Sequence, residues 1–133
     1  MDGEPLVPPG VIHGDAFLGN LLASPAGPVI CDFDGVGIGP REWDLVPVAV
    51  GALRFDYAAG LHDAFVRTYG VDVTRWAGFP ALRALRELQL VTSVLPTLEA
   101  NPALRPQWQV RLDSLRRRDG MRWTPYPGAR ISL

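Results

Sequence analysis

Residues 13–34 read HGDAFLGNLLASPAGPVICDFD, and this stretch predicts a tight hairpin with polar side chains at both ends. Two short apolar runs, at 21–23 and 29–32, flank the turn-forming sequence SPAGP at 24–28. The glycine-rich segment 35–40 that follows predicts a loop without regular structure. The hairpin therefore brings the residues before it and after it close together.

Three oxygen-bearing side chains surround this hairpin. Asp15 and Asn20 precede it, and Asp32 ends its second strand. Carboxylate and amide oxygens suit Mg²⁺, which proteins usually hold with one or two carboxylates together with substrate phosphates and water. Phosphoryl transfer needs such a metal and also a carboxylate that accepts the proton of the attacking hydroxyl group. The pattern therefore indicates a site for a hard cation such as Mg²⁺, which is the kind of metal that phosphoryl transfer requires.

The spacing of these residues resembles that of a known family. Protein kinases carry H-R-D, four residues, Asn and then D-F-G. This chain reads H-G-D at 13–15, four residues, Asn20, and then D-F-D at 32–34. Gly in place of Arg is usual in the small-molecule branch. The chain thus resembles the aminoglycoside phosphotransferase and choline kinase-like enzymes, which are distant relatives of protein kinases.

The resemblance implies a role for each matching residue. Asp15 would be the catalytic base, and His13 would steady the loop. Asn20 and Asp32 would bind the Mg²⁺ (or Mn²⁺) ions that bridge the phosphates of ATP or another nucleoside triphosphate. Asp34 is the weakest metal candidate, because it falls where D-F-G has Gly.

The sequence Trp43-Asp44-Leu45 resembles the Asp-Leu pair that opens the next helix in this family. By this resemblance, Asp44 would brace the catalytic loop from behind. A simple helix-capping role for Asp44 is the alternative, and one residue can do both.

The resemblance implies an α+β fold: a kinase-like C-terminal lobe, mostly helical, whose small β-hairpin carries the catalytic and metal-binding loops. Residues 1–10 are rich in Pro and Gly and form an extended lead-in or a severed linker. The lobe covers 11–120, with the catalytic loop and hairpin at 11–40 and a helical subdomain at 43–120. The tail at 121–133 is expected to be irregular.

Apolar periodicity predicts three helices after Leu45. Asp56 is expected to cap a helix that ends at Gly70, and Thr74 to cap one that ends at Pro96. Asn101-Pro102 signals the start of the third. The apolar face of the second would carry Leu82, Leu85, Leu88, Thr92 and Leu95.

A feature of the family has no counterpart in this sequence. All 13 basic residues are Arg, so the lysine with which the family's nucleotide lobe grips the phosphates is missing. We therefore expect a fragment or one half of a split enzyme, inactive on its own. The missing lobe, or self-association, would cover the exposed apolar face of such a lobe.

Composition excludes several other classes of function. A net charge of −1 gives no basic surface for nucleic acid, and the basic run at 116–118 fits a helix end. No apolar run approaches the length of a membrane span, and no signal peptide is recognisable, so we expect a cytoplasmic protein. Cys31 is the single cysteine, which rules out an internal disulfide.

Two other functions remain open from the sequence. The segment 30–36 also resembles the first motif of haloacid dehalogenase-type phosphohydrolases, with Asp32 as nucleophile and Asp34 as acid/base. Alternatively, the domain binds a metal, a nucleotide or a partner chain without catalysis. If it is a phosphotransferase, its small-molecule hydroxyl acceptor could be an antibiotic, a choline-like compound, a sugar or an amino alcohol.

Overall fold

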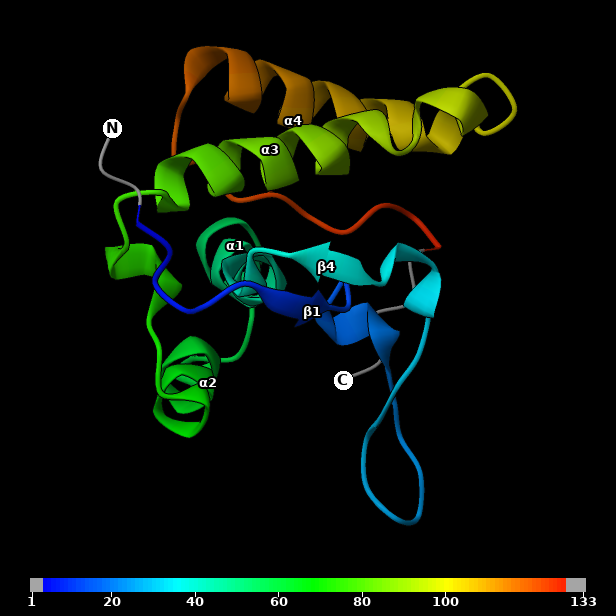
Figure 1. Ribbon diagram of the computed structural model, residues 1–133. Helices are drawn as coiled ribbons and strands as arrows, with labels where there is room; N and C mark the ends of the chain where they lie inside the picture. Colours follow the sequence, from blue (N-terminus) through cyan, green and yellow to red (C-terminus); the bar gives the residue numbers. More distant parts are fainter. Residues whose placement is uncertain (1–3, 129–133) are drawn as a thin grey trace.

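The computed structural model of the protein describes residues 4–128. These residues form four α-helices and two antiparallel two-stranded sheets. Figure 1 shows how the helices lie relative to one another. The predicted α+β composition is therefore confirmed. The strands are β1 Gly10–Ile12, β2 Leu21–Leu22, β3 Val29–Ile30 and β4 Gly37–Gly39, and the helices are α1 Val46–Arg54, α2 Leu61–Tyr69, α3 Phe79–Thr92 and α4 Arg105–Arg117.

The predicted hairpin is present. Strand β2 pairs with β3 so that Leu21 faces Ile30 and Leu22 faces Val29. In the turn between them, the Ser24 hydroxyl donates to the carbonyl oxygen of Gly27 at 2.6 Å. The hairpin projects away from the helices (Figure 1).

The prediction of a loop without regular structure at 35–40 was wrong. Residues Phe33–Gly35 form a 3₁₀ turn, and β4 then pairs with β1, with Val11 opposite Ile38. Glycines have low strand propensity, so the local sequence argued against a strand here. The partner strand lies far back in the chain, and its backbone hydrogen bonds provide what the local sequence lacks.

The core forms around α1. Its buried side chains Val46, Ala49 and Val50 pack with Leu45, Val73 and Phe79. Apart from Arg54, the sequence of α1 is apolar all round rather than amphipathic, which fits a helix that is covered on most sides. The helix begins directly after the Trp43-Asp44-Leu45 segment, as the resemblance implied.

The starts of α2 and α3 differ from prediction. Helix α2 begins after Gly60, not at Asp56, because Gly60 adopts the left-handed conformation, with φ 81°. It ends at Gly70 as predicted. Helix α3 begins after Gly78, and Thr74 does not cap it. Thr74 instead donates its backbone N–H to Asp72 in a separate 3₁₀ turn that ends before α3.

The predicted buried face of α3 was wrong beyond Leu82, which does pack against the core. Leu85 and Leu88 are 47% and 46% exposed, whereas Arg86, Glu87 and Val91 are buried. Apolar periodicity misplaced this face because the buried charged side chains have ion-pair partners on other elements.

Helix α4 lies beside α3 (Figure 1), and the chain from 119 to 128 then passes alongside α3 without regular structure. The start signal at Asn101-Pro102 is confirmed, although the first turn, Pro102–Leu104, is 3₁₀. The basic run lies at the end of α4, as predicted. The expected irregular tail is observed as far as 128, and residues 129–133 lie outside the described part.

No helix between residues 4 and 128 has the length and apolar character needed to cross a lipid bilayer.

Candidate functional site

The segment 13–20, here called the catalytic loop after its predicted role, begins with a buried histidine. His13 Nε2 lies 2.9 Å from the carbonyl oxygen of Cys31, and the Asp15 backbone N–H donates to Nδ1 at 3.3 Å. Because Nδ1 accepts, Nε2 must carry the proton and donate to Cys31. His13 therefore ties the loop to the segment that follows β3.

The carboxylate of Asp44 holds this loop from the opposite side. The backbone N–H groups of His13 and Gly14 donate to its two oxygens at 2.6 Å and 2.9 Å. The neighbouring Trp43 indole donates to the carbonyl oxygen of Gly14 at 2.8 Å. Helix α1 receives no side-chain cap, and its N-cap residue is Leu45, so Asp44 is used on the loop rather than on the helix.

Gly14 occupies a position that only glycine fits. Its φ is 89°, and a Cβ placed there would overlap the backbone carbonyl of Gly35. The catalytic loop and the 3₁₀ turn after Asp32 thus pack closely against each other at Gly14 and Gly35. This close contact explains why the residue between His13 and Asp15 is a glycine.

The side chain of Asp15 lies at the centre of the site. Arg86 of α3 donates from one terminal nitrogen to Oδ1 at 2.8 Å. The Asn20 amide nitrogen donates to the Asp15 carbonyl oxygen at 2.8 Å and approaches Oδ2 at 3.4 Å. The Asp15 side chain is 40% exposed, whereas that of Arg86 is 10% exposed. The carboxylate is therefore oriented from two sides and still accessible to a ligand.

Asn20 and Asp32 have different surroundings. Asn20 is buried, and its backbone carbonyl oxygen accepts a hydrogen bond from the Cys31 backbone N–H at 2.9 Å. Asp32 is exposed and has a left-handed backbone, with φ 64° and ψ 68°. The neighbouring Asp34 is exposed in the following 3₁₀ turn. Within residues 4–128, no three side chains of His, Cys, Asp or Glu cluster closely enough to hold a metal ion by themselves.

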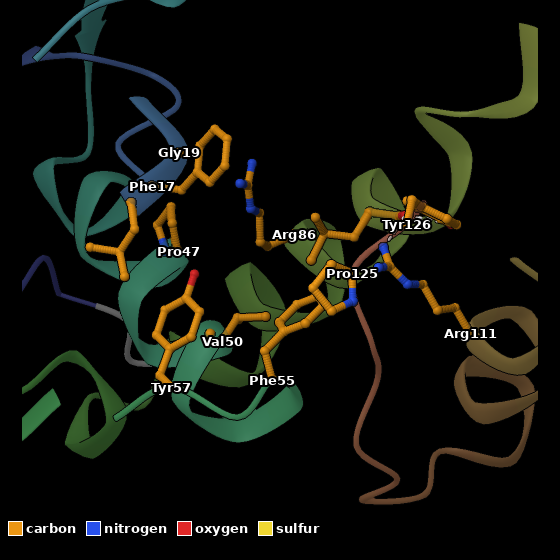
Figure 2. A pocket seen from close by; sticks show the side chains of 13 residues that line it. Phe17, Gly19, Pro47, Val50, Phe55, Tyr57, Arg86, Arg111, Pro125 and Tyr126 are labelled. Carbon is orange, nitrogen blue, oxygen red and sulfur yellow. Dashed lines mark hydrogen bonds between the residues drawn. The ribbon is translucent and has the colours of Figure 1, made fainter. Parts of the chain in front are cut away.

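Two hollows adjoin the Asp15–Arg86 pair. The Asp15 hollow has a volume of about 470 Å³, and its polar lining includes Asp15, Gln89 and Ser93. The apolar cavity has a volume of about 350 Å³ and lies between the catalytic loop, α1, α3 and the tail. Phe17, Arg86 and Leu90 line both. In Figure 2, the Arg86 side chain extends from α3 toward Phe17 and Gly19.

The family model described as "Phosphotransferase enzyme family" matches residues 3–88, well over half of the chain. The chain belongs to this family. The match covers the catalytic loop, both sheets, Asp44 and α3 as far as Leu88. No curated protein and no solved structure matches the chain.

Membership of the phosphotransferase family confirms the resemblance seen in the sequence and argues against the phosphohydrolase alternative. The fold agrees, since a haloacid dehalogenase-type enzyme needs alternating strands and helices, whereas the strands of residues 4–128 pair only as two antiparallel ladders.

Sequence reasoning missed one residue of this candidate site. His13, Asp15, Asn20 and Asp44, four of the residues proposed from the resemblance, are linked by direct hydrogen bonds. Arg86 lies 71 positions after Asp15, in a helix for which the sequence predicted a different buried face. No local signal marks it. From the sequence, a charged residue between Leu85 and Glu87 is expected to be exposed to solvent. Only the contact with Asp15 shows that Arg86 is buried.

Proposed function

We propose that this chain provides the catalytic and metal-binding part of a phosphotransferase that moves the γ-phosphoryl group of ATP, or of another nucleoside triphosphate, to a hydroxyl group of a small molecule. The observation that carries the proposal is the accessible Asp15 carboxylate, oriented by Asn20 and Arg86 in the wall of a hollow that can admit a small molecule.

In this proposal Asp15 is the general base. A base must lie within hydrogen-bond reach of the proton that it accepts, and the exposed part of Asp15 faces the Asp15 hollow. His13 and Asp44 act as positioning residues. They hold the backbone N–H groups of residues 13–15, so that the Asp15 carboxylate stays in place while an acceptor binds.

The donor set fits a divalent cation held partly by the nucleotide. The Asn20 amide nitrogen is occupied by Asp15, and its amide oxygen accepts no hydrogen bond from the described residues. The Asp32 carboxylate is exposed. Two oxygen ligands are too few for a protein-only site but suit Mg²⁺, which is normally completed by phosphates and water. When bound, the metal would neutralise charge on the phosphate oxygens.

The phosphate-gripping lysine of the family must come from elsewhere, since this sequence has none. We propose that a nucleotide-binding lobe, in the same protein or in a separate chain, covers the strand side of this domain. Large apolar side chains are exposed there: Val11 is 71%, Ile38 79% and Phe33 57% exposed. An apolar surface of this kind favours a partner over water.

The metal assignment is tested by Mn²⁺ binding to this chain in the presence of ATP, followed by electron paramagnetic resonance of free Mn²⁺. Because Asp32 is assigned as a direct ligand, Asp32→Asn should weaken binding by at least about tenfold. Asp34→Asn is the matched control, since it removes the same charge two residues away and should change little. Equal losses, or a larger loss for Asp34→Asn, would contradict the assignment.

A further inference from the structure

The charged residues that line the apolar cavity are all positive. Most of its wall is apolar, with Phe17, Val50, Phe55 and Leu90 among the lining residues. Its charged lining residues are Arg86 and Arg111, and no Asp or Glu lines it. Figure 2 shows Arg86 of α3 and Arg111 of α4 on the side of the cavity opposite Pro47 of α1 and Tyr57. A ligand in this cavity therefore meets positive charge and apolar surface.

Arg111 carries a buried charge that no carboxylate within residues 4–128 neutralises. It is 2% exposed, and it donates to the carbonyl oxygens of Leu90 and Thr124 at 3.2 Å and 2.7 Å. Its guanidinium carbon lies 3.7 Å from the centre of the Tyr126 ring. No ion pair to Arg111 occurs among the described residues, and burial lowers its pKa. Its positive field therefore extends into the cavity without a counter-ion.

Arg86 can contact a ligand directly. It is 8% exposed, and one terminal nitrogen makes its hydrogen bonds to Asp15 and Gln89. A guanidinium has five N–H donors, and those on the other two nitrogens have no acceptor among residues 4–128. Because Arg86 lines both hollows, a ligand paired with it can place a hydroxyl group near Asp15 and an apolar body in the cavity.

We infer that the acceptor of this phosphotransferase is a small hydroxy-carboxylate with an apolar body, recognised by Arg86 and favoured by the charge of Arg111. The claim that this ligand is the acceptor rests on the proposed function. The claim that the cavity binds an anion does not. A carboxylate matches the planar fork of a guanidinium and carries the single negative charge that a mostly apolar cavity can accommodate.

A cationic acceptor is disfavoured by the same residues. An ammonium group in the cavity would lose its hydration, gain no carboxylate partner and lie near two arginines. The Asp15 hollow offers one carboxylate, and Arg86 already pairs with it. Among the acceptors left open by the sequence, choline-like compounds and amino alcohols therefore fit this cavity worst.

The inference is tested with three probes that share a phenyl and a hydroxyl group and differ in charge. They are 3-phenyllactate (anionic), its amide (neutral) and phenylalaninol (cationic). Each is titrated into the unmodified chain without nucleotide, by calorimetry or ligand-observed NMR. We expect 3-phenyllactate to bind at least about tenfold more tightly than the amide, because it gains charge-assisted hydrogen bonds. Phenylalaninol should bind most weakly.

Variants then test which residue causes the preference for the anionic probe. Arg86→Met should remove most of the advantage of 3-phenyllactate over the amide, whereas Arg86→Lys should keep part of it because the charge remains. Arg105→Met is the control: it removes an exposed arginine from α4 that lines neither hollow. An unchanged preference in Arg86→Met would overturn the assignment of Arg86.

The unmodified chain can overturn the inference without any variant. Equal or tighter binding of the amide or of phenylalaninol would do so, and so would the absence of saturable 3-phenyllactate binding at millimolar concentrations. The proposed function fails differently: the anion preference would hold while no phosphoryl transfer depends on Asp15. The two ideas can therefore be rejected separately.

Discussion

The position of the Asp15 side chain depends on contacts from its own loop and from distant elements. Asn20 and Arg86 contact its carboxylate, and Asp44 and His13 fix the backbone around it. Asp44 uses both carboxylate oxygens on backbone N–H groups, and hydrogen bonds to charged groups are stronger than neutral ones. The geometry of the proposed base therefore follows from a small hydrogen-bonded unit.

Gly14 offers a test of this unit. Gly14→Ala should lower the free energy of unfolding by well over the roughly 1–2 kcal/mol that a left-handed residue with a Cβ costs, because the new Cβ also meets the Gly35 backbone. Gly70→Ala is a matched control, since Gly70 has the same φ of 89° and open space around its Cβ position. Urea unfolding of both variants measures the difference. Equal losses would show that the close approach to Gly35 contributes nothing.

The site residues that could be predicted from the sequence are those that lie in short motifs shared with the family. His13, Asp15 and Asn20 share one loop, so their spacing was sufficient to identify them. Arg86 could not be found in this way, because its partner lies across the fold and no period or motif marks it. The single observation that reveals it is the ion pair itself.

Some helices and strands could likewise be predicted from the local sequence, whereas others depend on partners that are distant in the chain. The hairpin of β2 and β3 follows from two apolar runs and a turn, which are contiguous in sequence. Strand β4 and the buried face of α3 do not, since each depends on a partner far along the chain. The end of α2 was predictable because Gly70 is a local signal, whereas its start required knowing that Gly60 is left-handed.

Helices α1, α3 and α4 are joined by one buried polar network. Arg54 of α1 forms two hydrogen bonds with Glu87 of α3, at 2.7 Å and 3.1 Å. It also donates to the Ser114 hydroxyl of α4 at 3.1 Å and to the Asp119 carbonyl oxygen at 2.8 Å. Breaking a buried pair from one side leaves an uncompensated charge, so these helices are held in one arrangement. The network fixes α3, and therefore Arg86.

This network should make stability depend on acid pH. Hydrogen bonds from Ser114, the Met121 backbone and Arg117 lower the pKa of Asp119 from 3.8 to about 2. For Glu87, burial raises the pKa, but hydrogen bonds from Arg54 and Arg83 outweigh it and lower the pKa below 4.5. In both cases the unfolded chain binds protons first, so stability is present above the ordinary pKa and is lost as pH falls toward the folded value.

Asp119→Asn should therefore flatten part of this dependence. Urea unfolding between about pH 5 and pH 2 should show a steep loss of stability in the unmodified chain and a shallower one in the variant. Glu99→Gln, which removes an exposed carboxyl outside the network, is the control. Parallel curves for Asp119→Asn and the unmodified chain would mean that Asp119 does not contribute to the acid sensitivity.

In the whole molecule, Asp15 lies between the apolar cavity and the exposed apolar surface of the strands. Helices α1, α3 and α4 and the tail enclose the apolar cavity, and the strands expose apolar side chains on the side that we assign to a nucleotide-binding lobe. Asp15 is accessible where these regions meet. An acceptor and a nucleotide could thus reach the carboxylate from different directions.

The most direct test of the account is the turnover of Asp15→Asn in a preparation supplied with a nucleotide-binding lobe of this family. Phosphoryl transfer from ATP to a panel of hydroxyl compounds of either charge would be followed by ³¹P NMR. Asp15→Asn keeps the shape and removes the base, so kcat should fall by roughly 10²–10⁴-fold while the KM for ATP changes little. Asn20→Ala, in contrast, should recover partly at raised Mg²⁺. If Asp15→Asn retains more than about a tenth of the activity, Asp15 is not the general base and the central claim is wrong.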